Sequence, residues 1–178
     1  MSSPAFTLRP AELRDVAPMV QLIRELAEFE KLTHLLQVTP EKLRPHLFGE
    51  KPVAEAMVAE LPADLVGEGD SPVVAFALFF TNFSTFLAQP GLYLEDLFVK
   101  PAHRGGGIGR ALLTRLARLA VERNYGRFEW SVLDWNENAI GFYEKLGATV
   151  MPDWRVCRIA GDALQAFGKS AASKERDA

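Results

Sequence analysis

The run Arg-Gly-Gly-Gly-Ile-Gly at residues 104–109 constrains the fold of this chain more than any other feature. The apolar run Leu92–Val99 before it predicts a strand, and the periodic run Ala111–Val121 after it predicts a helix. Glycines in such a turn can adopt positive φ angles and let the backbone approach a ligand closely. The first helical turn then offers unpaired N–H groups and the positive end of the helix dipole. Since Arg104 and Arg110 add charge, the pattern predicts a site for a phosphate-bearing ligand.

The residues around the glycines argue against two common phosphate sites. A P-loop ends in Gly-Lys-Ser/Thr, so that the lysine reaches the phosphates and the hydroxyl holds magnesium. Ile108–Ala111 supplies neither group. A dinucleotide-binding fingerprint follows the first strand and has an acidic residue at the end of the second strand. Here the glycines lie past the middle of the chain, and Asp134 comes late. Taken without its neighbours, the run would also fit a flexible turn before a helix.

Several segments around this turn together resemble one family. The loop Arg104-x-x-Gly107-x-Gly109, with the later segment Asn136–Ala148, resembles the GNAT acetyltransferases. The likeness extends from about Phe6 to Phe167 and is closest to the diamine (spermidine/spermine) and thialysine N-acetyltransferase branch. The segments that narrow it to this branch are Ile23–Glu30, Leu92–Val99, Trp135–Glu137, Phe142–Tyr143 and Trp154–Arg155.

The order of the predicted elements indicates an α/β fold in which helices cover both faces of a mixed sheet. The resemblance implies the GNAT fold, a mostly antiparallel central sheet whose fourth and fifth strands, expected at 92–99 and 127–132, splay apart. We expect one domain over residues 1–168 and a disordered tail over 169–178, because the tail is small, polar and charged. Further strands are predicted at 6–9, 54–60, 73–81, near 149 and at 155–159. Helices are predicted at 14–30, from Thr39 to before Gly49 and at 137–145. Loops are predicted at 62–72 and 82–91.

In the GNAT family the glycine loop binds the pyrophosphate of acetyl-CoA, so the resemblance implies acetyl-CoA as the co-substrate. It also implies that backbone groups of the strand over 92–99 contact the pantetheine arm, and that the last long helix contacts the CoA arm. Asn136 suits the N-cap of that helix equally well. The implied cofactor-binding residues are Leu97, Phe98, Val99, Arg104, Gly105, Gly106, Gly107, Ile108, Gly109, Arg110, Asn136, Asn138 and Ala139.

Acetyl transfer to an amine requires a deprotonated amine, a polarised thioester carbonyl and a protonated leaving thiolate. An alkyl ammonium has a pKa of about 10.4, and a carboxylate can attract it and relay its proton away through water. By resemblance, Tyr143 is the general acid and Glu95 is the base, acting through water. Strand alternation sends Glu95 and Asp96 to opposite faces unless a β-bulge intervenes. For either acid, pairing with a nearby arginine is the alternative.

The resemblance also implies where the acceptor binds, and Glu30 would hold the distal amine of a diamine. Ser84 and Phe86 stand where the polyamine enzymes carry an acidic residue and a tryptophan. The missing negative charge makes a shorter or zwitterionic amine at least as plausible as a long polycation. The implied substrate-binding residues are Phe29, Glu30, Glu95, Asp96, Ser131 and Asp153.

Composition limits the partners. A net charge of −3 without a dense basic stripe argues against nucleic acid. No apolar run reaches membrane-spanning length, and the polar start of the chain lacks a secretory h-region, so we expect a cytoplasmic protein with no membrane partner. The three histidines have no metal-ligand spacing, so no metal is expected. Cys157, the sole cysteine, is expected in the core.

Three functions follow from these observations. The main hypothesis is an N-acetyltransferase that transfers the acetyl group of acetyl-CoA to a small primary amine (a diamine, polyamine or thialysine-like amine) by direct attack in a ternary complex. The alternatives are acetylation of a protein or peptide amine, and a non-catalytic acetyl-CoA sensor. The presence of both Glu95 and Tyr143 argues against the sensor. The resemblance further implies a homodimer, with Trp154 as a candidate contact.

Overall fold

The computed structural model describes residues 6–174, with side chains up to residue 169. The chain divides into two compact units between Ser131 and Val132. The first unit contains a sheet and the helices that cover it, and the second contains two further helices.

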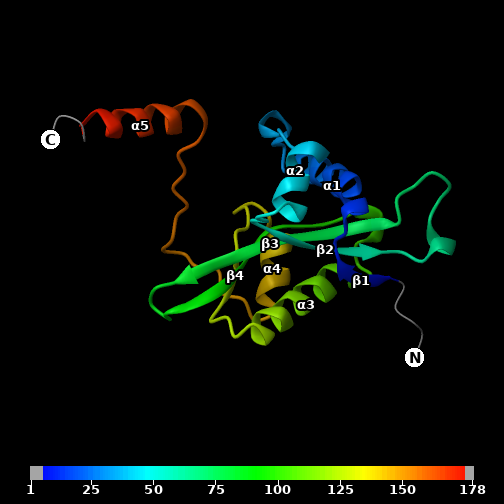
Figure 1. The fold of residues 1–178 in the computed structure, drawn as a ribbon. Helices are drawn as coiled ribbons and strands as arrows, with labels where there is room; N and C mark the ends of the chain where they lie inside the picture. The colour runs from blue at the N-terminus through cyan, green and yellow to red at the C-terminus, as the bar shows by residue number, and fades with distance from the viewer. Residues whose placement is uncertain (1–5, 175–178) are drawn as a thin grey trace. The chain divides into compact units, whose positions relative to one another are not determined.

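The first unit is built on one five-stranded sheet in the order β1-β2-β3-β4-β5 (Figure 1). Neighbouring strands are antiparallel from β1 to β4, and β5 joins β4 in parallel. The sheet is therefore mixed and mostly antiparallel, as predicted. Its strands are β1 (Thr7–Pro10), β2 (Glu55–Glu60), β3 (Val73–Ser84), β4 (Gln89–Val99) and β5 (Phe128–Trp130).

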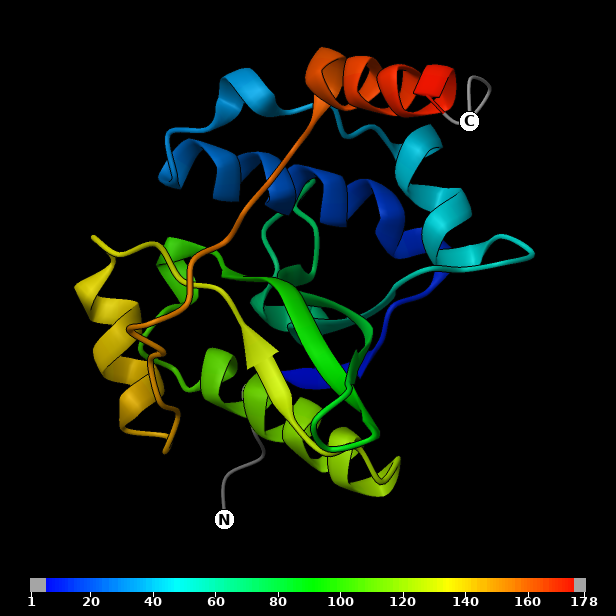
Figure 2. The same ribbon diagram turned by 90° about the vertical axis from the view of Figure 1, so that its left-hand side faces the viewer.

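Helices cover both faces of this sheet, which confirms the predicted architecture (Figure 2). Helices α1 (Val16–Phe29) and α2 (Pro40–Phe48) pack on one face, and α3 (Ile108–Glu122) packs on the other. Both α1 and α3 bury one apolar stripe at helical spacing. The core cluster under α1 and α2 contains Met19, Leu22, Leu26, Leu47, Ala56, Val58, Val73, Phe76 and Phe98.

The start of α2 has the predicted cap. Thr39 is the N-cap residue, its hydroxyl accepts a hydrogen bond from Lys42 N at 3.3 Å, and Pro40 is the first helical residue. Short 3₁₀ helices connect other elements, namely η1 (Leu13–Asp15), η2 (Thr33–Leu35), η3 (Ala63–Leu65) and η4 (Pro101–His103).

The predicted loop over 82–91 is wrong, because β3 and β4 continue as a hairpin and leave only residues 85–88 between them. Asn82 and Gly91 suggested a loop, but they lie opposite each other as strand partners. A Cβ at Gly91 would lie 2.4 Å from Asn82 Oδ1 and 2.8 Å from Arg127 Cγ. This glycine therefore marks close packing within a strand instead of a turn.

The second unit contains α4 (Glu137–Glu144) and α5 (Gly161–Lys174). The strands predicted near residue 149 and at 155–159 are wrong, since residues 145–160 form neither helix nor strand. The alternation of apolar and polar residues suggested strands, but a strand also needs a partner for its N–H and C=O groups.

Two further expectations concern the same part of the chain. Cys157 was expected in the core and is exposed, because the strand that would have carried it inward is not formed. Helix α5 includes residues 169–174 of the expected tail. The last four residues, 175–178, lie outside the described residues.

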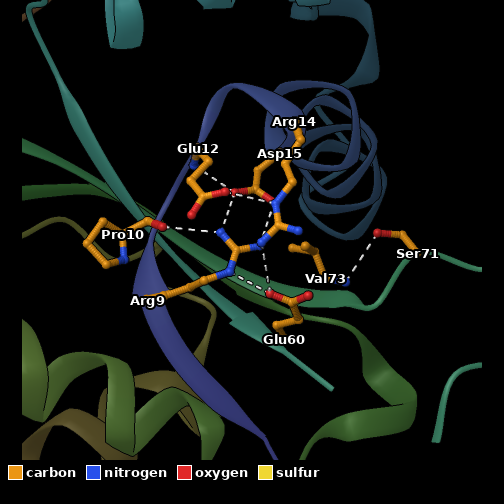
Figure 3. Close-up of polar contacts among 8 residues, drawn as sticks. All are labelled: Arg9, Pro10, Glu12, Arg14, Asp15, Glu60, Ser71 and Val73. Atoms are coloured by element: carbon orange, nitrogen blue, oxygen red, sulfur yellow. Dashed lines mark hydrogen bonds and ion pairs between the residues drawn. The ribbon is translucent and has the colours of Figure 1, made fainter. Parts of the chain in front are cut away.

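A buried ion pair ties β1 to the start of α1 (Figure 3). Asp15, 2% exposed, accepts hydrogen bonds from Arg9 Nη1 at 2.6 Å and Nη2 at 2.8 Å, and from Glu12 N at 2.7 Å. Arg9 also pairs with Glu60 of β2. Burial alone would raise the pKa of Asp15, but these hydrogen bonds lower it on balance. The ionised pair therefore belongs to the folded state.

Replacing Asp15 with Asn should lower the free energy of unfolding by about 2–4 kcal/mol at pH 7, because it leaves a largely buried guanidinium with Glu60 as its one remaining carboxylate partner. The lowered pKa means that the pair stabilises the protein above about pH 4 and that this stability is lost as the pH falls through the folded pKa. Urea unfolding at pH 7 and pH 3 tests both points. Glu122→Gln, which breaks the exposed pair with Arg115, should cost under about 1 kcal/mol; an equal loss in the two variants would contradict the prediction.

Candidate functional site

The glycine turn has the backbone that the sequence predicts. Gly105 and Gly107 have φ angles of +80° and +85°, a region that other residues rarely adopt. Gly107 is the N-cap residue of α3 and has no side chain to pair with the first N–H groups of the helix. The turn thus presents the positive end of α3 beside the C-terminal end of β4.

The space over this turn suits an anion. A Cβ built on Gly105 or Gly107 would meet no heavy atom within 4 Å, and the turn is exposed. An anion can therefore approach the backbone N–H groups directly, and the helix dipole favours it there. Ile108, the first residue of α3, has a buried side chain, so this residue offers only its backbone. The residues present fit the pyrophosphate group predicted for them.

The side chain of Arg104, which is exposed beside the turn, contacts two aromatic rings. Its guanidinium lies 5.1 Å from the ring centre of Phe29 and 5.4 Å from that of Phe98, and its Nε donates to Val99 O at 2.9 Å. Cation–π contacts of this length hold the arginine against the α1 face of the sheet. Arg104 thus links the glycine turn to Phe29, a residue predicted for the acceptor site.

Strands β4 and β5 pair over only three residues, Leu92–Leu94 with Phe128–Trp130. Strand β4 continues to Val99, and in the described part of the chain no strand pairs with this end on the β5 side. The predicted cofactor contacts Leu97, Phe98 and Val99 lie on this free edge. Since the Phe98 side chain is buried in the core, it is the backbone of this segment that is available to a ligand.

A β-bulge at Glu95 changes the predicted alternation. The register passes from Leu78 opposite Asp96 to Phe79 opposite Leu94, so that Glu95 has no partner on β3. Leu78 packs against the core cluster under α1, and its partner Asp96 therefore faces α1 as well. Glu95 is exposed and Asp96 is half-buried.

Three predicted acceptor residues form one electrostatic group beside the end of α1. Burial, together with the negative charges of Glu95 and Glu30, raises the pKa of Asp96 to about 6. Burial also raises the pKa of Glu30. Among residues 6–169, no lysine, arginine or histidine forms an ion pair with these three carboxylates. The arrangement favours a cation supplied from outside the chain.

Asp96→Asn should stabilise the protein at pH 8. Because the pKa of Asp96 is raised, its ionisation lowers the stability of the folded state. The protein has its full stability at low pH and loses part of it as the pH rises through about 6. We expect a gain on the order of 1–2 kcal/mol at pH 8 and almost none at pH 4. Urea unfolding at the two pH values measures the difference. The control Asp134→Asn, at an exposed position, should leave the stability unchanged at both pH values. A loss of stability in Asp96→Asn at pH 8 would refute the idea that ionised Asp96 destabilises the fold.

Tyr93 is a site residue that the sequence prediction missed. It lies opposite Phe80, stacks on that ring at 5.2 Å, and its hydroxyl forms a 2.8 Å hydrogen bond with Ser131 Oγ. Ser131 was predicted for the acceptor site and is exposed just after β5. A tyrosine in an otherwise apolar strand, close to two acids, was the signal that the sequence offered.

The remaining predicted site residues belong to the second unit. Asn136 is the N-cap of α4 and accepts from Ala139 N at 3.3 Å, which confirms its capping role. Asn138 is exposed on α4, and Tyr143 lies on the same helix with its ring centre 5.5 Å from that of Phe142. Asp153 is exposed in the segment between α4 and α5.

The hairpin residues that depart from the polyamine pattern are also placed. Ser84 is buried, and its hydroxyl accepts from Leu87 N at 3.3 Å. It therefore closes the turn after β3 instead of contacting a ligand. Phe86 stands at the tip of the hairpin and is 95% exposed.

The described residues lack two further features. Within residues 6–174, no group of three or more His, Cys, Asp or Glu side chains is arranged to hold a metal ion. No helix in that part of the chain has the length and apolar character needed to cross a membrane.

Comparison with known proteins gives one family. The model of the acetyltransferase (GNAT) family matches residues 24–148. An L-ornithine N5-acetyltransferase from Arabidopsis thaliana is 37% identical over 199 residues, covering 91% of this chain and 87% of that protein. A thialysine N-epsilon-acetyltransferase from Mus musculus is 38% identical over 162 residues, covering 89% and 94%.

The fold agrees with solved structures. An integron cassette protein from V. cholerae superposes with a TM-score of 0.74 at 23% identity, covering 94% of this chain and 99% of that one. A ribosomal-protein-alanine N-acetyltransferase from Brucella melitensis superposes with a TM-score of 0.67 at 24% identity, covering 88% and 99%. The family model, the sequence relatives and the fold agree, and the chain therefore belongs to the GNAT family of acetyltransferases.

Proposed function

We propose that this enzyme transfers the acetyl group of acetyl-CoA to a primary amine of a small molecule. The observation that carries the proposal is the cluster of Glu30, Glu95 and Asp96, which has no cation of its own among the described residues. An alkyl ammonium supplies the missing charge. The same strand that carries two of these acids ends beside the anion-binding turn, so one unit offers sites for both substrates.

Acetyl-CoA supplies the acetyl group as a thioester. The first N–H groups of α3 and the turn residues Gly105–Gly107 bind its pyrophosphate, with Gly109 and Arg110 on the first helical turn. The free backbone edge of β4 at Leu97–Val99 binds the pantetheine arm. N–H groups of such a rigid edge are the donors that polarise the carbonyl. As the resemblance implies, we also assign Asn136, Asn138 and Ala139 to the CoA arm.

On the acceptor side, the carboxylates attract the ammonium. Because they favour its charged form, the reaction also needs a group that removes the proton. Glu95 is exposed on its bulge, and we assign to it the removal of the first proton through a water molecule. Asp96 and Glu30 hold the cation in place, and Phe29 lines the apolar stem of the amine. Asp153 is assigned to the distal end of the acceptor, as the resemblance implies.

Tyr143 completes the reaction by donating its phenolic proton to the departing sulfur. The nitrogen loses two protons overall. The first passes to Glu95 and the water beside it, and the second is released as the carbon–sulfur bond breaks and replaces the proton that Tyr143 gave. The products are the N-acetylated amine and CoA thiol, and the enzyme returns to its starting charge after Glu95 releases its proton to solvent.

The acceptor that fits best is a short amine with a polar or zwitterionic far end. Two relatives at 37% and 38% identity act, by name, on ornithine and thialysine, which are amino acids with a side-chain amine. The hairpin carries Ser84 and Phe86 where a long polycation would meet another acid. A diamine is the second acceptor class, since a spermidine/spermine acetyltransferase-like protein from Homo sapiens is 31% identical over 143 residues, 80% of this chain and 20% of that protein.

Two alternatives have a specific test each. Acetylation of a protein or peptide amine requires turnover with a short peptide, and the three-carboxylate group favours a free cation over an extended chain. A non-catalytic sensor requires tight acetyl-CoA binding without turnover, and the paired presence of Glu95 and Tyr143 favours an enzyme.

The experiment that tests the proposal measures thiol release from acetyl-CoA with thialysine, ornithine, lysine, putrescine, spermidine, spermine and a short peptide. Saturable turnover with one of the small amines, with no turnover of the peptide, is the expected result. Turnover of the peptide alone would favour a protein substrate. Binding of acetyl-CoA without turnover of any amine would favour the sensor.

The proposal extends to the assembly. We propose one catalytic domain over residues 1–168, acting in the cytoplasm as a homodimer with Trp154 at the contact, and requiring no metal, nucleic acid or membrane. Exposed Trp154, Met151 and Val156 supply apolar surface for such a contact. Sedimentation that gives only a monomer at micromolar concentration would overturn the dimer.

A further inference from the structure

A pair of hydroxyl groups bridges β4 and β5 where their backbone pairing ends. Tyr93 and Ser131 are joined by a 2.8 Å hydrogen bond, and the last backbone pair is Leu94 with Trp130. Ser131 is thus the first residue after β5, and its side chain still reaches back to β4. The bond therefore links β4 and β5 just beyond their last backbone pair.

The hydroxyl pair lies on the same face of the sheet as the carboxylate of Asp96. Tyr93 pairs with Phe80, and Asp96 pairs with Leu78, two residues away on β3. Residues two apart on a strand share a face, so Tyr93 and Asp96 are neighbours, roughly 7 Å apart along the strand. The bulge at Glu95 is what brings them to one face, because regular alternation would separate residues 93 and 96.

An ammonium group needs acceptors for three N–H bonds. Asp96 and Glu95 supply charge on one side, and the oxygens of Tyr93 and Ser131 each keep a free lone pair after bonding to each other. Both hydroxyls are accessible, since Tyr93 is half-buried and Ser131 is exposed. Oxygen acceptors on two sides of the nitrogen fix the orientation of the amine. A carboxylate alone does not fix it.

We propose that Tyr93 and Ser131 bind the acceptor nitrogen, accepting two of its N–H bonds so that the lone pair left by the departing proton points at the thioester. This inference rests on the proposed function and deepens it. It assigns a substrate contact to Tyr93 and makes the site selective for primary amines. A secondary amine, once deprotonated, has only one N–H to offer, and the pair cannot hold it in the same orientation.

The test compares Tyr93→Phe and Ser131→Ala with the wild type, using thialysine and putrescine. The secondary-amine substrates are thialysine N-methylated on its side-chain amine and putrescine N-methylated on both nitrogens. Each variant should lose about 10-fold in kcat/KM for the primary amine, as expected for one hydrogen bond to a charged group. The dissociation constant for acetyl-CoA should not change. The preference for the primary over the N-methylated amine should shrink in both variants, and Ser131→Thr, which keeps the hydroxyl, should restore it.

A matched control lies on the opposite face of the sheet. Tyr125 and Thr81 form a hydroxyl pair with the same 2.8 Å length, and Tyr125→Phe removes it without touching the carboxylates. This variant should keep both kcat/KM and the preference for primary amines.

The outcomes separate the two claims. If Tyr93→Phe turned over amines at the wild-type rate and kept the preference for primary amines, the hydroxyl contact would be overturned. The proposed function would still stand. An equal loss in Tyr125→Phe would make the effect one of general stability and would also overturn it. Absence of turnover of every small amine by the wild type would remove the proposed function, and this inference with it.

Discussion

Tyr143→Phe is expected to lower turnover by about 10²–10⁴-fold, the usual contribution of a positioned general acid. The departing thiolate then has no proton donor, while the phenyl ring keeps its contact with Phe142 on α4. Affinity for acetyl-CoA should stay within a factor of about two, because the lost interaction is made in the transition state and not in the bound complex. Steady-state thiol release and calorimetric titration with acetyl-CoA together measure the two effects.

The appropriate control for Tyr143 is again Tyr125→Phe, which removes a tyrosine hydroxyl bonded to Thr81 and outside the site. Its turnover should match the wild type. An unchanged rate in Tyr143→Phe would remove this residue from the mechanism. A loss of acetyl-CoA binding equal to the loss of turnover would make Tyr143 a binding residue instead of an acid.

Gly107→Val should reduce the affinity for acetyl-CoA by at least roughly 100-fold, equivalent to about 3 kcal/mol. Two effects combine here. A β-branched residue is strained at the φ of +85° that Gly107 adopts. Its side chain would also fill the open space over the turn, where a pyrophosphate must reach the N–H groups of α3. Calorimetry with acetyl-CoA gives the affinity, and thermal unfolding gives the cost of the strain.

Gly69→Val provides the control for backbone strain, because Gly69 has a φ of +80° and equally open surroundings but lies in the loop before β3. It should lose comparable stability and keep normal acetyl-CoA binding. Normal binding by Gly107→Val would refute the assignment of this turn to the pyrophosphate.

These variants also bear on why part of the site was predictable. The glycine turn was identified because its requirement is local. Positive φ at Gly105 and Gly107 depends on the residue type itself, and the strand before and the helix after have periodic apolar patterns. The cap at Asn136 and the cap at Thr39 are local in the same way, since each side chain bonds an N–H three residues along the chain.

The misplaced elements depend on contacts between distant residues. Asn82 and Gly91 read as a loop, yet the packing of Arg127 against Gly91 shows why glycine belongs within a strand there. Residues 155–159 alternate as a strand does, but no partner strand is formed for them in the described chain. Cys157 is exposed for the same reason. A strand is completed by its neighbour, and a single sequence does not name that neighbour.

By itself, the sequence determined the glycine turn before α3, the α/β fold class, the resemblance to the family and the two helix caps. These follow from glycine stereochemistry, apolar periodicity and the placement of charge, all of which act over a few residues. Only the tertiary structure decided that a bulge at Glu95 brings Tyr93 to the same face as Asp96, that Glu30 adds its charge there, and that Tyr93 meets Ser131. Register, burial and electrostatic coupling depend on which distant segments pack together, and they are therefore settled when the sheet and α1 come together.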